Sequence, residues 1–175
     1  MKKLLLSLVF IGCGITITWA WGAWGHQHIN RAAVLALPAE MRPFFYNHID
    51  FLTEEAVVPD LRKYTLNDRA EFPRHFINLE TYDADGNIAN LPHTMQEAKA
   101  KYADTFLNKA GILPWYILQV EEKLTKAFKA GRKTEILFLA ADLGHYIGDA
   151  HMPLHTALNH DGQLTGQKGD RKSVV

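Results

Sequence analysis

The sequence has 175 residues, of which 47% are hydrophobic and 22% are charged, and its 19 basic and 19 acidic residues balance. This composition is typical of one globular domain with a substantial core, and it excludes an intrinsically disordered chain. Without an excess of basic residues, a protein that wraps duplex nucleic acid by charge alone is also excluded, although bound divalent cations would make one cleft locally positive.

Residues 1–20 have the composition of a secretory signal peptide. Two lysines precede the apolar run "LLLSLVFIGCGITIT", and Thr18 and Ala20 are the small residues expected before a cleavage site at Trp21. The apolar run is shorter than the roughly 20 residues that a transmembrane helix needs. We therefore expect a secreted or periplasmic protein, with no transmembrane segment in the mature chain. Removal of the leader leaves 17 basic and 19 acidic residues, a net charge of −2.

The single cysteine, Cys13, leaves an alternative for the leader. "FIGC" loosely resembles the lipobox of a bacterial lipoprotein, and Cys13 would then carry the lipid. Phe10 is a poor first residue for that motif, so cleavage before Trp21 is the preferred interpretation. One cysteine cannot form a disulfide within the chain.

The mature chain reads as a series of helices punctuated by proline and glycine, with no alternating pattern typical of strands. We expect helices over residues 26–37, 42–58 (as one or two), 93–111, 113–131 and 133–151, and an irregular segment over 60–93. Thr94 and Glu97 have the spacing of a capping box, and Gly111 and Gly131 stand where helices end. These patterns predict an all-α fold, as one domain over residues 21–175. The polar, glycine-rich sequence after His155 suggests that this domain is incomplete at its C-terminus.

The segment "DLGHYIGDAHMPLH" carries the first candidate site. His145 and Asp149 lie four residues apart, which places both on one face of an otherwise apolar helix. Burying a carboxylate and an imidazole is costly without a partner, and a zinc ion would provide one because it binds both. An isolated pair would instead suggest a histidine bonded to a carboxylate. This pair has further candidate ligands elsewhere: His26, Asp60, His75 and His155.

In order and spacing, these residues resemble the S1/P1 nuclease family and the related bacterial zinc-dependent phospholipases C. The shared pattern is an N-terminal Trp with a nearby His in "WGAWGH", an Asp and a His fifteen residues apart, and "HYIGDAHMPLH". The resemblance implies a secreted all-α phosphodiesterase with a cluster of up to three zinc ions. It covers essentially the whole mature chain.

The resemblance also implies a role for each ligand. One zinc would be held by Asp60, His75, His145 and Asp149. A second would be bound by His26 and by the α-amino group and carbonyl oxygen of Trp21, with Asp149 bridging the two ions. Asp60 and Asp149 would thus be the catalytic carboxylates, and His155 would contribute to a third zinc. Two close zinc ions would deliver a bridging hydroxide to phosphorus, while the third stabilises the leaving oxygen.

The chain departs from the family pattern in its third site. The family supplies a later His followed four residues on by an acidic residue, whereas the late candidates here, His160, Asp161 and Asp170, lack that spacing. The third zinc site is therefore expected to be incomplete in this sequence. This leaves open a zinc-binding helical domain without catalysis. A histidine-aspartate phosphohydrolase is disfavoured, because His160 and Asp161 lie in the glycine-rich tail.

Four residues are candidates for binding substrate. Lys63 stands where the nucleases carry a phosphate-binding Arg, with Arg62 beside it, and either side chain can hold a phosphate. Phe76 and Asn78 fall where the nucleases hold a base by stacking and hydrogen bonding, although for a single Phe core packing is the favoured interpretation.

The other polar side chains near these motifs have simpler expectations. Asp142 lies three residues before His145 and is predicted to orient a ligand histidine. His151 is expected on the surface or behind the ligands, and His28, His48 and His93 are expected to be structural or solvated.

The preferred functional interpretation is a zinc-dependent phosphodiesterase that cleaves single-stranded nucleic acid through a zinc-bridged hydroxide. The alternative is a phospholipase C, which performs the same attack on a phospholipid headgroup. The partner is then the substrate, single-stranded nucleic acid or phospholipid, and no stable protein partner is implied.

Overall fold

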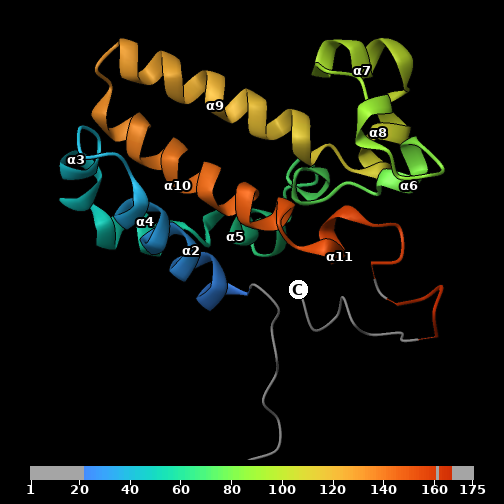
Figure 1. The fold of residues 1–175 in the computed structure, drawn as a ribbon, viewed down its shortest axis with the longest axis horizontal. Coiled ribbons are helices and arrows are strands. Elements are labelled where there is room, and N and C mark those ends of the chain that lie inside the picture. Colours follow the sequence, from blue (N-terminus) through green and yellow to red (C-terminus); the bar gives the residue numbers. More distant parts are fainter. Residues whose placement is uncertain (1–21, 161, 167–175) are drawn as a thin grey trace, which may run out of the picture.

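The computed structural model describes residues 22–160 and 162–166, and every regular element in these ranges is a helix (Figure 1). The α-helices are α2 (Ala23–Ala36), α3 (Arg42–Tyr46), α4 (Ile49–Glu55), α5 (Val58–Tyr64), α6 (Leu79–Tyr82), α7 (Met95–Lys101), α8 (Asp104–Ala110), α9 (Leu113–Lys129), α10 (Lys133–Ala150) and α11 (Pro153–Thr156). Two short 3₁₀ helices are η1 (Phe72–His75) and η2 (Ile88–Asn90). The all-α prediction is confirmed. The predicted signal peptide, with Cys13, and Trp21 lie outside the described residues, as do Asp161 and Asp170.

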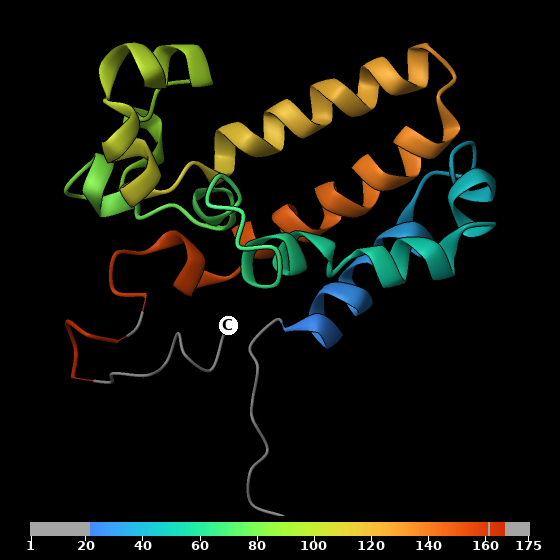
Figure 2. The same ribbon diagram turned by 180° about the vertical axis from the view of Figure 1, so that it is seen from behind.

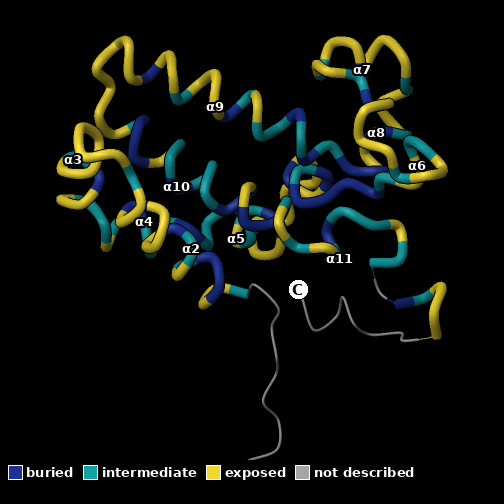
Figure 3. The backbone as a smooth tube through the Cα atoms, in the orientation of Figure 1, coloured by how far each residue is buried: buried dark blue, intermediate teal, exposed yellow. Residues whose placement is uncertain are grey.

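Helix α10 is the central element. It packs against α9 on one side and against α2 and α4 on the other (Figures 1 and 2). The apolar core between these helices includes Val34, Phe45, Leu52, Ile136 and Ala141. Buried residues follow the inner face of α10, whereas the outer face of α9 is largely exposed (Figure 3). The polar residues predicted on α10 lie at its C-terminal end, beyond this core.

Two predictions about the helices need correction. The segment expected as one helix over 93–111 is broken after Lys101, because Tyr102 adopts an extended backbone and its ring packs against the rings of Tyr82 and Phe106. The segment expected to be irregular from residue 60 is helical at its start, because α5 extends to Tyr64. Pro59 fits the first turn of α5, where a backbone N–H would have no partner within the helix. Asp60 is therefore held on a helix.

The predicted helix caps have local causes. The Thr94 hydroxyl accepts a hydrogen bond from the Glu97 backbone N–H at 3.1 Å, and the Glu97 carboxylate accepts one from the His93 N–H at 2.8 Å. Gly111 and Gly131 follow α8 and α9 with φ of 87° and 64°, the left-handed region that glycine enters without strain. The capping prediction is confirmed.

A close approach between α2 and α10 positions the site. Asn30 on α2 donates from its Nδ2 to the carbonyl oxygens of Leu52, at 3.1 Å, and Ala141, at 3.0 Å. Gly144 and Gly148 on α10 face Asn30 and the His26 ring, where a Cβ atom would collide with Asn30 and crowd His26. These glycines let α2 lie near enough to α10 for His26 to reach the end of that helix.

Replacing Gly111 with alanine is expected to lower the free energy of unfolding by about 3 kcal/mol or more. Its positive φ alone costs an alanine about 1 to 2 kcal/mol, and a Cβ would lie 2.7 Å from Cδ2 of the Phe76 ring and closer still to its carbonyl oxygen. Urea unfolding measures the loss. Gly131→Ala is the matched control, because its φ is also positive but nothing lies within 4 Å. Equal losses in the two variants would contradict a role for the Phe76 contact.

Candidate metal centre

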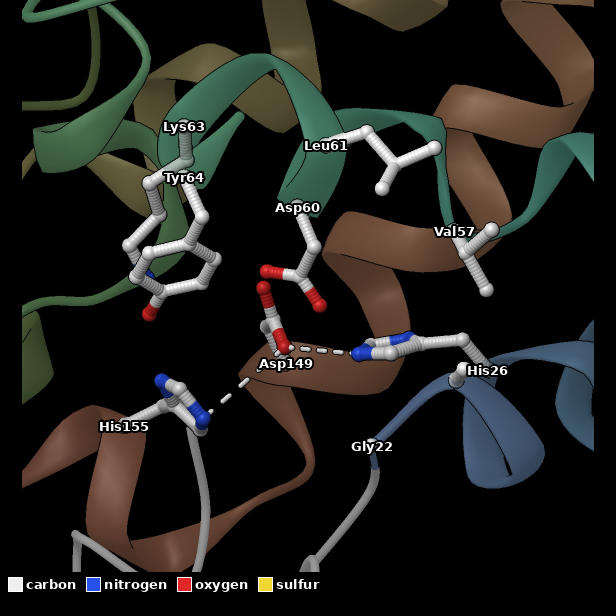
Figure 4. Close-up of a pocket in the computed structure, with 10 residues that line it drawn as sticks. Gly22, His26, Val57, Asp60, Leu61, Lys63, Tyr64, Asp149 and His155 are labelled. Carbon is white, nitrogen blue, oxygen red and sulfur yellow. Dashed lines mark ion pairs between the residues drawn. The ribbon is translucent and has the colours of Figure 1, made fainter. Parts of the chain in front are cut away.

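Six of the predicted ligands meet at the C-terminal end of α10, although they come from five elements. The set consists of His26 on α2, Asp60 on α5, His75 in η1, His145 and Asp149 on α10, and His155 on α11. All are buried except Asp60, whose side chain is 31% exposed. Trp21 is not described, but the next residue, Gly22, lines the pocket formed beside Asp149 (Figure 4).

Asp149 lies at the centre of this cluster and is 2% exposed. Its Oδ2 is 3.0 Å from His75 Nδ1 and 3.3 Å from His145 Nε2. Its Oδ1 is 3.4 Å from His26 Nε2 and 3.9 Å from His155 Nε2. The two oxygens thus face two different pairs of histidines, which is the geometry of a carboxylate able to bridge two ions.

The donor atoms fit a metal ion in chemistry and in spacing. Two groups have all their ligand atoms within 4.8 Å of one another: His26, His145 and Asp149, and Asp60, His75 and His145. With ligand bonds of roughly 2.0 to 2.1 Å, neighbouring donors around a tetrahedral zinc are about 3.3 Å apart. The 3.0 to 3.9 Å separations around Asp149 are close to that spacing.

Asp149 and His145 each stabilise the charged form of the other. Burial alone would raise the pKa of Asp149, but the charge of His145 and hydrogen bonds from its histidine neighbours hold that pKa well below its ordinary value. Burial alone would lower the pKa of His145, but the charge of Asp149 raises it. A positive charge beside the buried carboxylate stabilises its ionised form, and a metal cation held by the same residues would supply such a charge.

The group that orients His145 differs from the prediction. His145 Nδ1 donates to the backbone carbonyl oxygen of Ala56 at 2.7 Å, which leaves Nε2 facing the cluster. Asp142, predicted for this role, instead accepts a hydrogen bond from Arg62 Nη2 at 2.8 Å. A backbone carbonyl carries no side-chain signature, so the sequence contained no sign of this contact.

Arg62, one of the candidate phosphate ligands, has its guanidinium group hydrogen-bonded to other side chains of the protein. Its Nε donates to Glu71 at 3.1 Å, and its Nη2 donates to Asp142 and, at 3.1 Å, to the Tyr146 hydroxyl. Arg62 is not among the residues that line the pocket beside Asp149. The structure therefore places Arg62 outside that pocket.

Lys63 lines that pocket, whose volume is about 360 Å³. It is 7% exposed, and its Nζ lies 4.5 Å from the centre of the Tyr64 ring. Figure 4 shows the carboxylates of Asp60 and Asp149 facing each other across the pocket, with His26 and His155 on either side. Tyr64 was not predicted as a site residue. It lies four residues after Asp60 on the same helix face, so a correct prediction of helix α5 would have identified it.

Phe76 and Asn78 lie in a second pocket of about 430 Å³, whose other lining residues include Phe72, Lys109 and His160. The Phe76 ring is 3% exposed and packs against Phe72. Asn78 is also buried, and its Oδ1 has no hydrogen-bond partner among the described residues. The structure thus divides the predicted site residues between two pockets.

For the predicted third metal position, no second ligand joins His155 among the described residues. His155 belongs to neither of the two groups of metal-binding atoms found among the described residues, and His160 lines the second pocket. His28, His93 and His151 are exposed, as expected for residues outside the site.

Glu71 was missed by sequence analysis. It is 0% exposed and lies between Arg62, Arg74, Tyr146 and His75. Burial alone would raise its pKa, but contacts with His75 and Tyr146 and the charge of Arg62 lower that pKa to about 2. A lone glutamate four residues before a histidine gave no signal, because its partners come from distant parts of the chain.

The fold and the site define an all-α protein with a buried histidine and aspartate cluster suited to metal ions. The family model for S1/P1 nuclease matches residues 21–170, and the chain belongs to this family. Comparison with curated proteins and with solved structures found no match. The predicted family is confirmed, and membership supports a nuclease-type hydrolase of phosphodiester bonds. None of the helices in the described part is both long and apolar enough to cross a membrane.

Proposed function

We propose that the mature chain is an exported zinc-dependent phosphodiesterase that cleaves single-stranded nucleic acid. The observation that carries the proposal is Asp149, whose two oxygens each face a pair of imidazole nitrogens in a buried cluster that opens to a pocket through Asp60. Zinc bound here would polarise a phosphoryl oxygen and activate water as the nucleophile. Family membership supports phosphodiester bonds as the target.

The chain's own residues have separable tasks in this proposal. Asp149 and the histidines would hold zinc, together with Asp60, which is the most exposed of these residues. Lys63 lies in the same pocket and supplies the positive charge that binds the phosphate. Trp21 is proposed to bind zinc through its α-amino group, since Gly22 and Ala23 line the pocket.

The second pocket supports the proposed preference for single strands. Phe76, Phe72 and Phe106 line it, and Asn78 Oδ1 behind them is a buried acceptor without a hydrogen-bond partner among the described residues. A base can reach an acceptor inside a pocket only when it is unpaired and unstacked. We therefore propose that this pocket receives a base of the substrate.

A phospholipase C activity is the second candidate, and one observation favours it. Val57, Leu61 and Tyr64 line the pocket beside Asp149, and Leu61 and Tyr64 are each 49% exposed. This apolar wall suits the acyl chains of the diacylglycerol part of a lipid. Assays on a single-stranded oligonucleotide and on phosphatidylcholine vesicles separate the two. Hydrolysis of the oligonucleotide is expected, and hydrolysis of phosphatidylcholine alone would overturn the proposed substrate. A zinc-binding protein without turnover on either would support the non-catalytic alternative.

Replacing Lys63 with methionine is expected to lower kcat/KM for a single-stranded oligonucleotide about 10- to 100-fold. A hydrogen bond to a charged group contributes about 1.5 to 3 kcal/mol, and methionine keeps the length of the buried stem. Steady-state kinetics measures the effect. Lys126→Met is the matched control, because Lys126 is 65% exposed and pairs with Glu122 on the surface of α9. An unchanged kcat/KM in the Lys63 variant would remove this residue from the proposed site.

A further inference from the structure

We propose that Glu71 is a positioning residue that holds the His75 ring, with its proton on Nε2, so that Nδ1 is presented to the metal. The inference rests on the proposed zinc site. It assigns a role to a residue that makes no contact with substrate or metal itself.

The two nitrogens of His75 have different surroundings. Nδ1 faces the cluster, at 3.0 Å from Asp149 Oδ2, 3.1 Å from His145 Nε2 and 3.7 Å from Asp60 Oδ1. Nε2 points away from the cluster and lies 3.4 Å from Glu71 Oε1, an ion-pair distance, and it has no hydrogen-bond partner among the described residues. His75 is only 1% exposed, so no solvent competes with Glu71 for the Nε2 proton. A neutral imidazole carries one proton, and a proton on Nε2 leaves the Nδ1 lone pair for a metal.

Glu71 is itself fixed from three sides. Its Oε2 accepts hydrogen bonds from Arg62 Nε at 3.1 Å and from Arg74 Nη1 at 2.8 Å, and its Oε1 accepts one from the Tyr146 hydroxyl. A carboxylate held by two guanidinium groups and a phenol cannot rotate away from the histidine. A carboxylate behind a ligand histidine fixes the ring orientation and makes the other nitrogen a better ligand.

The same contacts connect the elements that carry the other ligands. Arg62 lies on α5, two residues from Asp60, and Tyr146 lies on α10 beside His145. Glu71 immediately precedes η1, which carries His75. Glu71 therefore joins η1 to α5 and α10 at the point where their ligand residues meet.

The test compares the zinc affinity of Glu71→Gln with that of the unchanged protein, by competition with a chelator of known affinity. Loss of such a supporting partner is expected to weaken zinc binding about 10- to 100-fold. Asp142→Asn is the matched control, since it removes a carboxylate from Arg62 without touching His75. Its zinc affinity is expected to stay close to that of the unchanged protein. Unchanged affinity in Glu71→Gln, or an equal loss in both variants, would overturn the inference.

A second measurement needs no variant and therefore does not depend on Glu71→Gln folding. Imidazole nitrogen NMR of the zinc-loaded protein is expected to show His75 with its proton on Nε2 and the metal on Nδ1. The opposite assignment would overturn the role of Glu71 while leaving the zinc site intact. Absence of zinc binding by the unchanged protein would instead overturn the proposed function, and this inference with it.

Discussion

Replacing Asp149 with asparagine is expected to reduce phosphodiester hydrolysis by about a thousandfold or more. Asparagine keeps the shape of the side chain but removes the charge that faces four imidazole groups. Metal ions contribute several kcal/mol to such reactions, and about 1.4 kcal/mol corresponds to a factor of ten in rate. In the proposed site Asp149 would bind both ions, so the zinc content of the protein is also expected to fall.

Kinetics with a single-stranded oligonucleotide and metal analysis of the purified variant test this prediction together. Asp50→Asn is the control for charge, because the Asp50 side chain is 85% exposed and forms an ion pair with Arg31 on the surface, away from the cluster. Near-normal activity of the Asp149 variant, at a normal zinc content, would show that the cluster is not the reaction centre.

Retaining one extra residue before Trp21 is expected to lower activity about a hundredfold or more, with loss of zinc from one position. The α-amino nitrogen of Trp21 can donate a lone pair only when it is a free N-terminus, and a peptide nitrogen cannot replace it at neutral pH. Gly22, the residue that would follow this N-terminus, lines the pocket beside Asp149. The loss of one ion again corresponds to several kcal/mol.

The matched control is the same preparation after proteolytic removal of the extra residue, which should restore zinc and activity together. Mass spectrometry establishes the N-terminus in both forms, and in protein expressed with its leader it separates cleavage before Trp21 from lipidation at Cys13. Equal activity of the extended and trimmed forms would exclude the α-amino group as a necessary ligand.

Sequence patterns within one helix correctly predicted the features that depend on that helix alone. His145 and Asp149 were found from sequence because a spacing of four residues places them on one helix face whatever surrounds the helix. The caps at Thr94 and Gly111 were predicted for the same reason. The break at Tyr102 was not predictable, because rings from other segments of the chain hold that residue in an extended conformation.

Contacts between distant residues were the part that the sequence did not reveal. Arg62 was a reasonable phosphate ligand by position, but its partner Asp142 lies 80 residues away. Glu71 meets Tyr146 across 75 residues. The family resemblance identified residues that gather around Asp149, because their order in the chain is a family pattern. It said nothing about which side chains stand behind them, and those depend on how the helices pack.

The central claim is that the histidine and aspartate cluster holds zinc and that hydrolysis depends on it. The most direct measurement is hydrolysis of a single-stranded oligonucleotide by the mature protein before chelation, after chelation and after stoichiometric return of zinc, with zinc per chain determined at each stage. We expect bound zinc and activity to fall together on chelation and to return together. Full activity in protein shown to contain no metal would contradict the claim.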